Sequence, residues 1–416
     1  MKNKTPIALA TLLVIALAVW IAIRFVKNED RSYYPITPIA INQNGVGFAG
    51  STTCAECHPK ITKSHLHTAH YRTFQKADSN TILGSFKKGE NRLYLGSERY
   101  LQMVKEDSFF FEESRLVENN KLLKRHKIDL VVGSGTKGQS YLTWSDDELY
   151  QLQTSFFTPT ANWINSPGYP KTTLGQLRPV GSRCLECHTT YAKEMPGLHK
   201  GNRYDKSQII GRIDCERCHG PSADHVNFHK DNREVTEANH ILKIKNLSRK
   251  QRLDACALCH SGLRVQTEKK PFSFVTGDTL TQFSTPNYDV NSLANLDVHG
   301  NQYGLFTASK CFKQTSTMDC STCHNPHENQ RGQTELFLRK CMDCHTTNKA
   351  MTHCSLPLSE RNASAKNCID CHMPLSQSES IKINNLKNKR EQVNIRTHLI
   401  AIYPNQWINS PEESVH

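Results

Sequence analysis

Fourteen of the sixteen cysteines in this 416-residue chain fall into seven copies of one pattern, Cys-x-x-Cys-His. In chain order, motifs 1 to 7 read CAECH (54–58), CLECH (184–188), CERCH (215–219), CALCH (256–260), CSTCH (320–324), CMDCH (341–345) and CIDCH (368–372). Thiols and an imidazole at this spacing suit a zinc site, a redox-active dithiol, a disulfide framework or covalent attachment of a haem. The sevenfold repetition helps to decide among these four chemistries.

The histidine that follows each second cysteine favours haem over the other chemistries. A thiolate zinc site has no need of it, and a thioredoxin-like pair occurs once and works without it. In haem c, two thiols form thioethers with the two vinyl groups while the adjacent histidine binds the iron. The sequence therefore predicts seven covalently bound haem c groups.

The thioether cysteines and proximal histidines come directly from the motifs. They are Cys54, Cys57, His58, Cys184, Cys187, His188, Cys215, Cys218, His219, Cys256, Cys259, His260, Cys320, Cys323, His324, Cys341, Cys344, His345, Cys368, Cys371 and His372.

Thirteen further histidines are candidates for the opposite, distal axial position of the irons. They are His65, His67, His70, His126, His199, His225, His229, His240, His299, His327, His353, His398 and His416. Met373 or Met103 can also ligate iron, although a core position suits a methionine better. The sequence does not decide which residue serves which haem, because axial ligands can come from distant segments.

The composition agrees with an interior built partly from cofactor. Only 37% of the residues are hydrophobic and the mean hydropathy is −0.58, so side-chain burial is thin for this length. Seven macrocycles supply apolar surface, and their propionates, about fourteen negative charges, balance the net charge of +13. The Lys and Arg residues are scattered and not in blocks, so no feature calls for nucleic acid as a partner.

The N-terminus has the composition of a membrane-targeting segment. Lys2 and Lys4 precede a mostly apolar run over residues 7–26, which is long enough to cross a bilayer. The candidate cleavage site, Ala16-Leu17-Ala18, is followed by more apolar chain. We therefore predict a single uncleaved transmembrane helix that anchors the protein in the cytoplasmic membrane, with the haem domain on the periplasmic or extracytoplasmic side.

We expect a mainly α fold with irregular loops around stacked haems, as in multihaem cytochromes c, plus a small inserted β module. The expected segments are a signal-anchor (1–27), a tether (28–50), a first haem segment (51–80), a β-rich insert (81–160), haems two to four (161–264), a linker (265–305), and haems five to seven with a C-terminal ligand segment (306–416). Stretches of the insert such as QSYLTW show partial period-two alternation. GSGTKG (133–138) precedes such a stretch, so a hairpin turn is favoured over a dinucleotide site.

Cys311 and Cys354 lie outside the motifs. A disulfide between them suits an oxidising compartment. A buried free thiol and a thiolate haem ligand are the alternatives for Cys311.

Several segments together resemble the cytochrome c-552/c-554-like family of multihaem c-type cytochromes, which is related to the hydroxylamine oxidoreductase group. The resemblance spans residues 47–405 and rests on FAGSTTCAECHPK, Thr68-Ala69-His70, CERCHGPSADH, SYLTWSDDELYQL, WINSPGY, SRCLECHTTY, STCHNPHE, CIDCHMP and RTHLIAIYP. It implies distal ligation by His70, His225, His327 and His398, with His299 and His353 as further candidates. A Cys-x-x-Cys-Lys motif and an eighth haem motif, found in related enzymes, are missing from this sequence.

Two functions fit this pattern. The first is electron transfer in a respiratory chain, between a quinol-linked or other redox protein donor and an acceptor, through closely spaced six-coordinate haems. The second is an oxidoreductase that acts on a small nitrogen or sulfur compound, such as nitrite, hydroxylamine or tetrathionate, at one haem with an open axial position. His65, His67, His126 or a nearby Lys or Arg would then be candidate proton donors, and the sequence does not choose among them. No motif singles out a catalytic residue, and we favour electron transfer.

Overall fold

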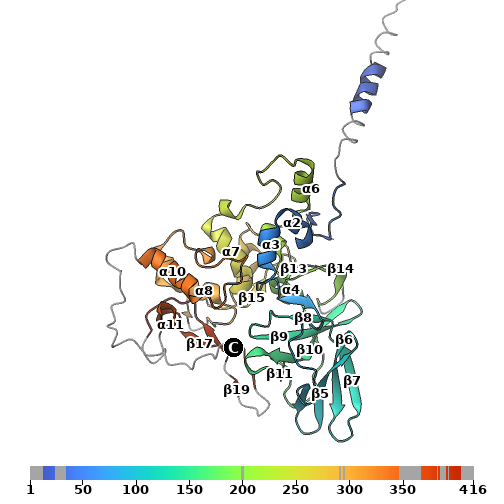
Figure 1. Ribbon diagram of the computed structural model, residues 1–416, viewed down its shortest axis with the longest axis vertical. Helices are drawn as coiled ribbons and strands as arrows, with labels where there is room; N and C mark the ends of the chain where they lie inside the picture. Colours follow the sequence, from blue (N-terminus) through green and yellow to red (C-terminus); the bar gives the residue numbers. More distant parts are fainter. Residues whose placement is uncertain are drawn as a thin grey trace, which may run out of the picture.

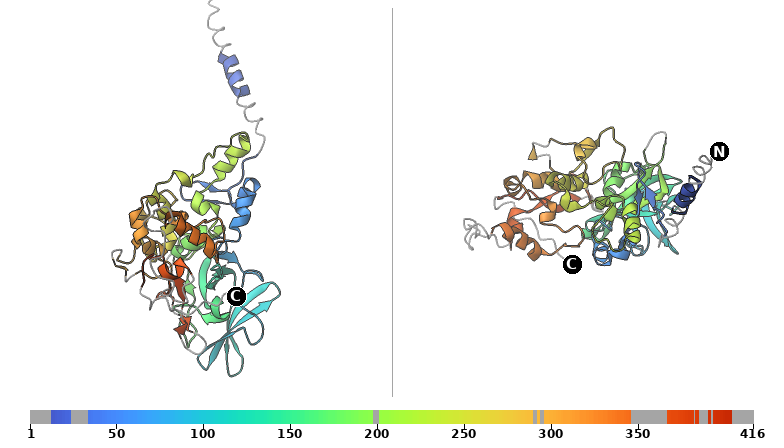
Figure 2. Two further views of the ribbon diagram at one scale, coloured as in Figure 1. Left: turned by 60° about the vertical axis from the view of Figure 1, so that its left-hand side comes forward. Right: turned by 90° about the horizontal axis from the view of Figure 1, so that it is seen from above.

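The computed structural model describes residues 13–23, 34–197, 201–289, 292–293, 296–345, 367–381, 383–384, 390–391 and 393–403. Strands and helices separate in space. The long strands β5 to β10 gather at one end of the molecule, and the helices with the haem motifs fill the rest (Figure 1). Two further views show the same separation (Figure 2).

Two antiparallel sheets form the strand-rich end. The first has the order β4-β5-β6-β7 and consists of β4 (Arg92–Leu95), β5 (Arg99–Glu106), β6 (Phe109–Leu116) and β7 (Leu122–Lys127). The second has the order β11-β10-β9-β8-β3, with β12 also paired to β10. Its strands are β3 (Phe74–Lys76), β8 (Leu130–Val132), β9 (Gly138–Ser145), β10 (Glu148–Phe157), β11 (Asn162–Asn165) and β12 (Arg178–Pro179).

An apolar cluster joins the two sheets. Met103 of β5 and Phe110 of β6 pack with Val131, Tyr141 and Trp163 of the second sheet. Alternate residues of a strand point to one face. Met103 is therefore fully buried, although some of its neighbours in β5 are not. The residues 133–138 turn the chain between β8 and β9, which pair antiparallel, so the hairpin interpretation of GSGTKG is confirmed.

Short two-stranded ribbons connect the remaining segments. They pair β1 (Ala40–Ile41) with β2 (Gly47–Phe48), β13 (Thr189–Glu194) with β14 (Tyr204–Gly211), β15 (Arg264–Gln266) with β16 (Ser284–Pro286), β17 (Leu375–Gln377) with β20 (Asn394–Arg396), and β18 (Ile383–Asn384) with β19 (Arg390–Glu391).

All seven motifs lie on or at short helices. The motif helices are α2 (Ser51–Cys57), α4 (Ser182–His188), α5 (Cys215–His219), α7 (Arg249–His260), η5 (Cys320–Thr322), α10 (Thr334–His345) and α11 (Cys368–His372). The other helices from Pro59 onward are α3 (Pro59–His65), η1 (Thr158–Thr160), α6 (Ala223–Asp231), η2 (Ile244–Asn246), η3 (Leu280–Gln282), α8 (Gln302–Ala308) and α9 (Lys310–Gln314).

A polar residue just before the first cysteine starts several of these helices. Asp214 accepts a hydrogen bond from the backbone N–H of Cys215. Asp319 and Asn367 cap η5 and α11 in the same way, from the same sequence position. Their side chains satisfy backbone donors that a helix start leaves unpaired, so the local sequence sets where each motif begins.

Our prediction of a mainly α fold is wrong, because helix accounts for 29% and strand for 26% of the described residues. The additional strands outside residues 81–160 are β3, β11 and β12 of the second sheet and the strands of the two-stranded ribbons. The ribbons pair segments up to about twenty residues apart, for example β13 with β14, and local patterning does not reveal them. The predicted segment boundaries remain a prediction.

The predicted transmembrane anchor is also wrong by this structure. Within the predicted span, the structure describes a helix over residues 13–23. No helix in the described part of the chain is long and apolar enough to span a membrane. The prediction followed the hydropathy of the run and the charges that flank it, and the other residues of the apolar run lie outside the described ranges.

Candidate haem-binding sites

The motif cysteines lie against one another although they are distant in sequence. Three pairs of thiols are hydrogen bonded: Cys54 with Cys215, Cys187 with Cys259, and Cys256 with Cys320. Motif 1 therefore contacts motif 3, motif 2 contacts motif 4, and motif 4 contacts motif 5.

Electrostatic effects between thiols extend this series. Burial, and then the nearby Cys256 thiol, raise the pKa of Cys218 to about 11. Burial and Cys341 likewise raise the pKa of Cys323 to about 11, and burial and Cys368 raise the pKa of Cys341. The motifs thus follow one another in space in the order 1-3-4-5-6-7, and motif 2 branches from motif 4.

Three motif histidines face a histidine from a distant segment at a nearly constant distance. The ring centroids are 6.1 Å apart for His219 and His327, 5.9 Å for His324 and His398, and 6.1 Å for His70 and His260. An iron between two imidazoles requires bonds of about 2 Å on each side and about 1 Å from each nitrogen to its ring centre, about 6 Å in total. These three pairs have the separation that an iron bound on both faces requires.

Two more pairs emerge from electrostatic effects. Burial and, to a smaller extent, nearby His299 lower the pKa of His188 to about 4, against the raising effect of a hydrogen bond to Thr73. Burial lowers the pKa of His225, and His58 is among the neighbours that add to this. His299 therefore lies near motif 2 and His225 near motif 1.

Hydrogen bonds orient several of these rings through Nδ1. A carbonyl oxygen can only accept, so an Nδ1 facing one must carry the proton, and Nε2 then has a free lone pair for a metal. The carbonyl acceptors are Leu242 for His219 (3.4 Å), Asn239 for His225 (2.6 Å) and Ala401 for His372 (2.8 Å). His188 Nδ1 has the Thr73 hydroxyl at 2.7 Å instead.

Burial also favours the neutral form of two candidate distal ligands, which is the form that metal binding demands. Burial is the main cause that lowers the pKa of His70 and of His398 to about 4. The Nδ1 atom of His398 is buried and has no hydrogen-bond partner among the described residues.

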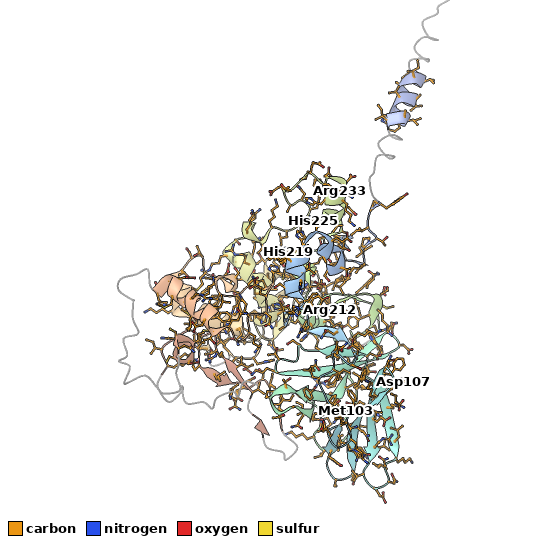
Figure 3. The ribbon with its side chains drawn as sticks, in the orientation of Figure 1. Met103, Asp107, Arg212, His219, His225 and Arg233 are labelled. Carbon is orange, nitrogen blue, oxygen red and sulfur yellow. The ribbon has the colours of Figure 1, made fainter. Side chains whose placement is uncertain are left out.

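Buried arginine atoms next to motifs 2 and 3 fit the acidic edge of a haem. Within the described residues, Arg183 Nη1, Arg212 Nε and Arg217 Nε are buried without a hydrogen-bond partner. The backbone of Arg212 is in the left-handed region (φ 73°) and its guanidinium lies 4.5 Å from the centre of the Tyr71 ring. A haem propionate would satisfy such donors, and Figure 3 shows Arg212 below His219 in the motif-rich part of the molecule.

Several motif helices bury no side chain of their own. Helices α2, α10 and α11 contain no buried residue, whereas the two largest apolar clusters, which consist mostly of strand residues, hold half of the buried aliphatic and aromatic side chains. Short helices of this kind need another apolar surface to pack against. A haem macrocycle supplies that surface, so the residues present fit the cofactor.

Other candidate histidines have different surroundings. The ring of His65 is tied through Nε2 to the Ile213 carbonyl at 3.0 Å, His67 is exposed, and His126 belongs to strand β7. Met103 is a core residue of the strand-rich end, remote from the motif helices. His199, His353, His416 and Cys354 lie outside the described residues. Cys311 is a free thiol whose pKa burial raises.

Two carboxylates inside the motifs were missed by the sequence analysis. Glu216 of motif 3 accepts hydrogen bonds from the backbone of Ala49 and Gly50, which precede motif 1, and from Ser222. Glu186 of motif 2 accepts from Phe272 and Gln266. In the sequence, each is an acidic residue that comes directly before an Arg or a Cys inside a motif. In the structure, their carboxylates join one haem segment to another.

Comparisons with known proteins agree with this geometry. Residues 171–220, which contain motifs 2 and 3, match the family model described as cytochrome c554 and c-prime. The chain is similar in structure to the outer cell wall cytochrome OcwA, with a TM-score of 0.52 and 16% identity over 85% of this chain and 79% of that chain. A search of curated proteins gave no match. The matches support a multihaem c-type cytochrome with covalently bound haem c, while the predicted relation to the hydroxylamine oxidoreductase group stays a prediction.

Proposed function

We propose that this protein is an exported heptahaem c-type cytochrome that carries single electrons in a respiratory chain, between a quinol-linked or other redox protein and an acceptor. Haem c supplies reversible one-electron exchange at its iron. The name of the structural neighbour, an outer cell wall cytochrome, supports export.

The spatial series of motifs carries this proposal. Hydrogen bonds or electrostatic effects between cysteine thiols link motifs 1, 3, 4, 5, 6 and 7 in one path, and Cys187 and Cys259 link motif 2 to motif 4. Each thioether sulfur fixes one edge of a macrocycle, so motifs in contact bring the edges of neighbouring haems together. A path of this kind serves to move electrons from one end of the molecule to the other.

The residues around each haem set its reduction potential, and so how readily it accepts an electron. We propose that His225, His299, His327, His70 and His398 bind the irons of motifs 1, 2, 3, 4 and 5, opposite the motif histidines. Ligation by two histidines generally gives lower reduction potentials than ligation by histidine and methionine. Partly buried arginines beside motifs 2 and 3, each with a buried nitrogen that lacks a hydrogen-bond partner among the described residues, would balance the propionates.

Electron paramagnetic resonance of the oxidised protein tests this function. Irons with two axial histidines give low-spin ferric signals, and they bind cyanide slowly or not at all. We expect low-spin signals and no rapid cyanide binding. A substantial high-spin signal together with rapid binding of cyanide or nitric oxide would contradict a pure carrier and favour an oxidoreductase acting on a small nitrogen or sulfur compound.

A further inference from the structure

One loop supplies hydrogen-bond acceptors to ligands of two different haems. Residues 232–242 connect α6 to the segment that leads into η2. The Asn239 carbonyl accepts from His225 Nδ1 at 2.6 Å, and the Leu242 carbonyl accepts from His219 Nδ1 at 3.4 Å. The Leu242 N–H also donates to the His219 carbonyl at 3.4 Å. The loop therefore orients both imidazole rings.

The two rings belong to neighbouring sites. His219 is the proximal histidine of motif 3, and His225 lies near His58 of motif 1. An ion pair of 3.0 Å between Lys230 of α6 and Glu56 of α2 holds the helix of His225 against motif 1. His219 and His225 lie close to each other in the upper part of the molecule in Figure 3.

A third histidine holds the loop in place. His229 follows His225 by one helical turn on α6, and their ring centroids are 4.6 Å apart. Its Nδ1–H donates to the Val235 carbonyl at 3.1 Å, and its Nε2 accepts from the Asn239 N–H at 3.4 Å. Both ring nitrogens are thus engaged with the loop, so His229 is not free to bind iron. From the sequence alone, His229 is one of the thirteen candidate distal ligands.

These contacts form one connected series. His229 fixes the Asn239 peptide, the carbonyl of Asn239 orients His225, and the Leu242 carbonyl, three residues further along, orients His219. A hydrogen bond to the second nitrogen of a ligating histidine sets the orientation and basicity of the ring. A change at His229 would therefore reach two irons through one loop.

We propose that His229 is a positioning residue that sets the axial geometry of the haems of motifs 1 and 3 together, through the loop 232–242. The inference rests on the proposed haem ligation and adds the residue that couples two adjacent sites.

Substitution of His229 in the full-length, haem-loaded protein tests the inference. His229→Leu has nearly the same bulk but cannot accept from the Asn239 N–H, whereas the amide oxygen of His229→Gln can. His67→Leu is the matched control, since His67 is an exposed histidine outside the loop. Each variant is first checked for haem content by intact mass.

The readouts are the low-spin resonance signals and the potentiometric titration of each variant. The signals of the two haems are assigned with His225→Met and His219→Met, which each change one axial ligand. We expect His229→Leu to shift both assigned signals and both midpoint potentials, His229→Gln to shift them less, and His67→Leu to leave them unchanged.

The possible outcomes distinguish a failure of this inference from a failure of the proposed function on which it rests. A His229→Leu protein with full haem content and unchanged signals would overturn the positioning role and leave electron transfer untouched. A shift in only one of the two signals would overturn the coupling. If His229→Leu fails to load haem, the comparison of His229→Gln with the native protein decides by the same criterion. A native protein without covalent haem would instead refute the proposed function.

Discussion

At the residue scale, Asp319 shows how a single carboxylate fixes a haem motif. One of its oxygens accepts from the backbone N–H and the hydroxyl of Ser321, inside motif 5. The other accepts from Arg252 of α7 at 2.5 Å. Asp319 is 4% exposed, so its charge depends on these partners. It connects the helix of motif 4 with the start of motif 5.

The charge of Asp319 predicts a pH-dependent stability. Burial alone would raise the pKa of Asp319, but the Ser321 and Arg252 hydrogen bonds outweigh it and bring the pKa below the usual carboxylate range. Because the folded pKa is lowered, the stabilisation is present above the usual pKa near 4 and is lost as the pH falls through the folded value.

We expect Asp319→Asn to lower the free energy of unfolding by about 3 kcal/mol at neutral pH, since it leaves the charge of Arg252 without its partner. Denaturant unfolding at pH 7 and pH 3 measures this, with exposed Glu328→Gln as control. The difference between native protein and variant should shrink at pH 3. An equal difference at both pH values would show that charge is not the cause.

The residues that bind covalently can be read from the sequence, and the distal partners only in part. Cys54, Cys57 and His58 must be close in sequence because one haem binds all three, the cysteines at its vinyl groups and the histidine at its iron. His219 and His327, in contrast, lie more than one hundred residues apart, and no local pattern encodes their approach. The resemblance pointed to His327 as a ligand but not to its haem, and the structure supplies the pairing that we propose.

At the element scale, motif 4 on helix α7 is the junction of the path. Its cysteines Cys256 and Cys259 contact motifs 5 and 2, respectively, and Cys218 of motif 3 lies near Cys256. Motif 2, in contrast, sits at the end of a branch. Loss of a haem should therefore have different consequences at the two positions.

This difference gives a matched pair of variants. Cys256→Ala with Cys259→Ala removes the attachment of the junction haem, and Cys184→Ala with Cys187→Ala removes that of the branch. With a photoreductant tethered at exposed position Lys60, next to motif 1, we expect electrons to stop after the haems of motifs 1 and 3 in the first variant. In the second they should reach every remaining haem.

Absorbance during continuous illumination reports how many haems become reduced, and intact mass confirms that each variant has lost one haem. Equal reduction of the remaining haems in both variants would contradict the branched path.

Elements differ in how far local sequence predicts them. The strands between Arg92 and Phe157 show partial period-two alternation and form hairpins with close neighbours, such as β5 with β6, so they are visible in the sequence. Ribbons such as β17 with β20 contain few residues and depend on distant partners. The motif helices start at capping residues such as Asp214, which are local signals.

At the scale of the whole molecule, the helices around the motifs and the strand-rich end differ in how many side chains they bury. The sheets bury Met103, Tyr141 and other large side chains with almost no exposure, as in an ordinary apolar core. Helices α10 and α11 bury none. The thin hydrophobic composition therefore reflects one part of the chain whose interior we assign to cofactor, and not a uniformly weak core.

The N-terminal prediction of a spanning helix, made from the apolar run over residues 7–26 and its flanking charges, is contradicted at this scale. No helix among the described residues is long and apolar enough to span a membrane.

The mass of the purified, denatured polypeptide tests the central claim most directly. The amino acids alone account for 47.2 kDa. Our account predicts a mass increased by seven haem groups, which remain attached after denaturation because they are bound through thioethers, together with sharp absorption bands on reduction. A polypeptide with the mass of its amino acids alone and no such bands would contradict it.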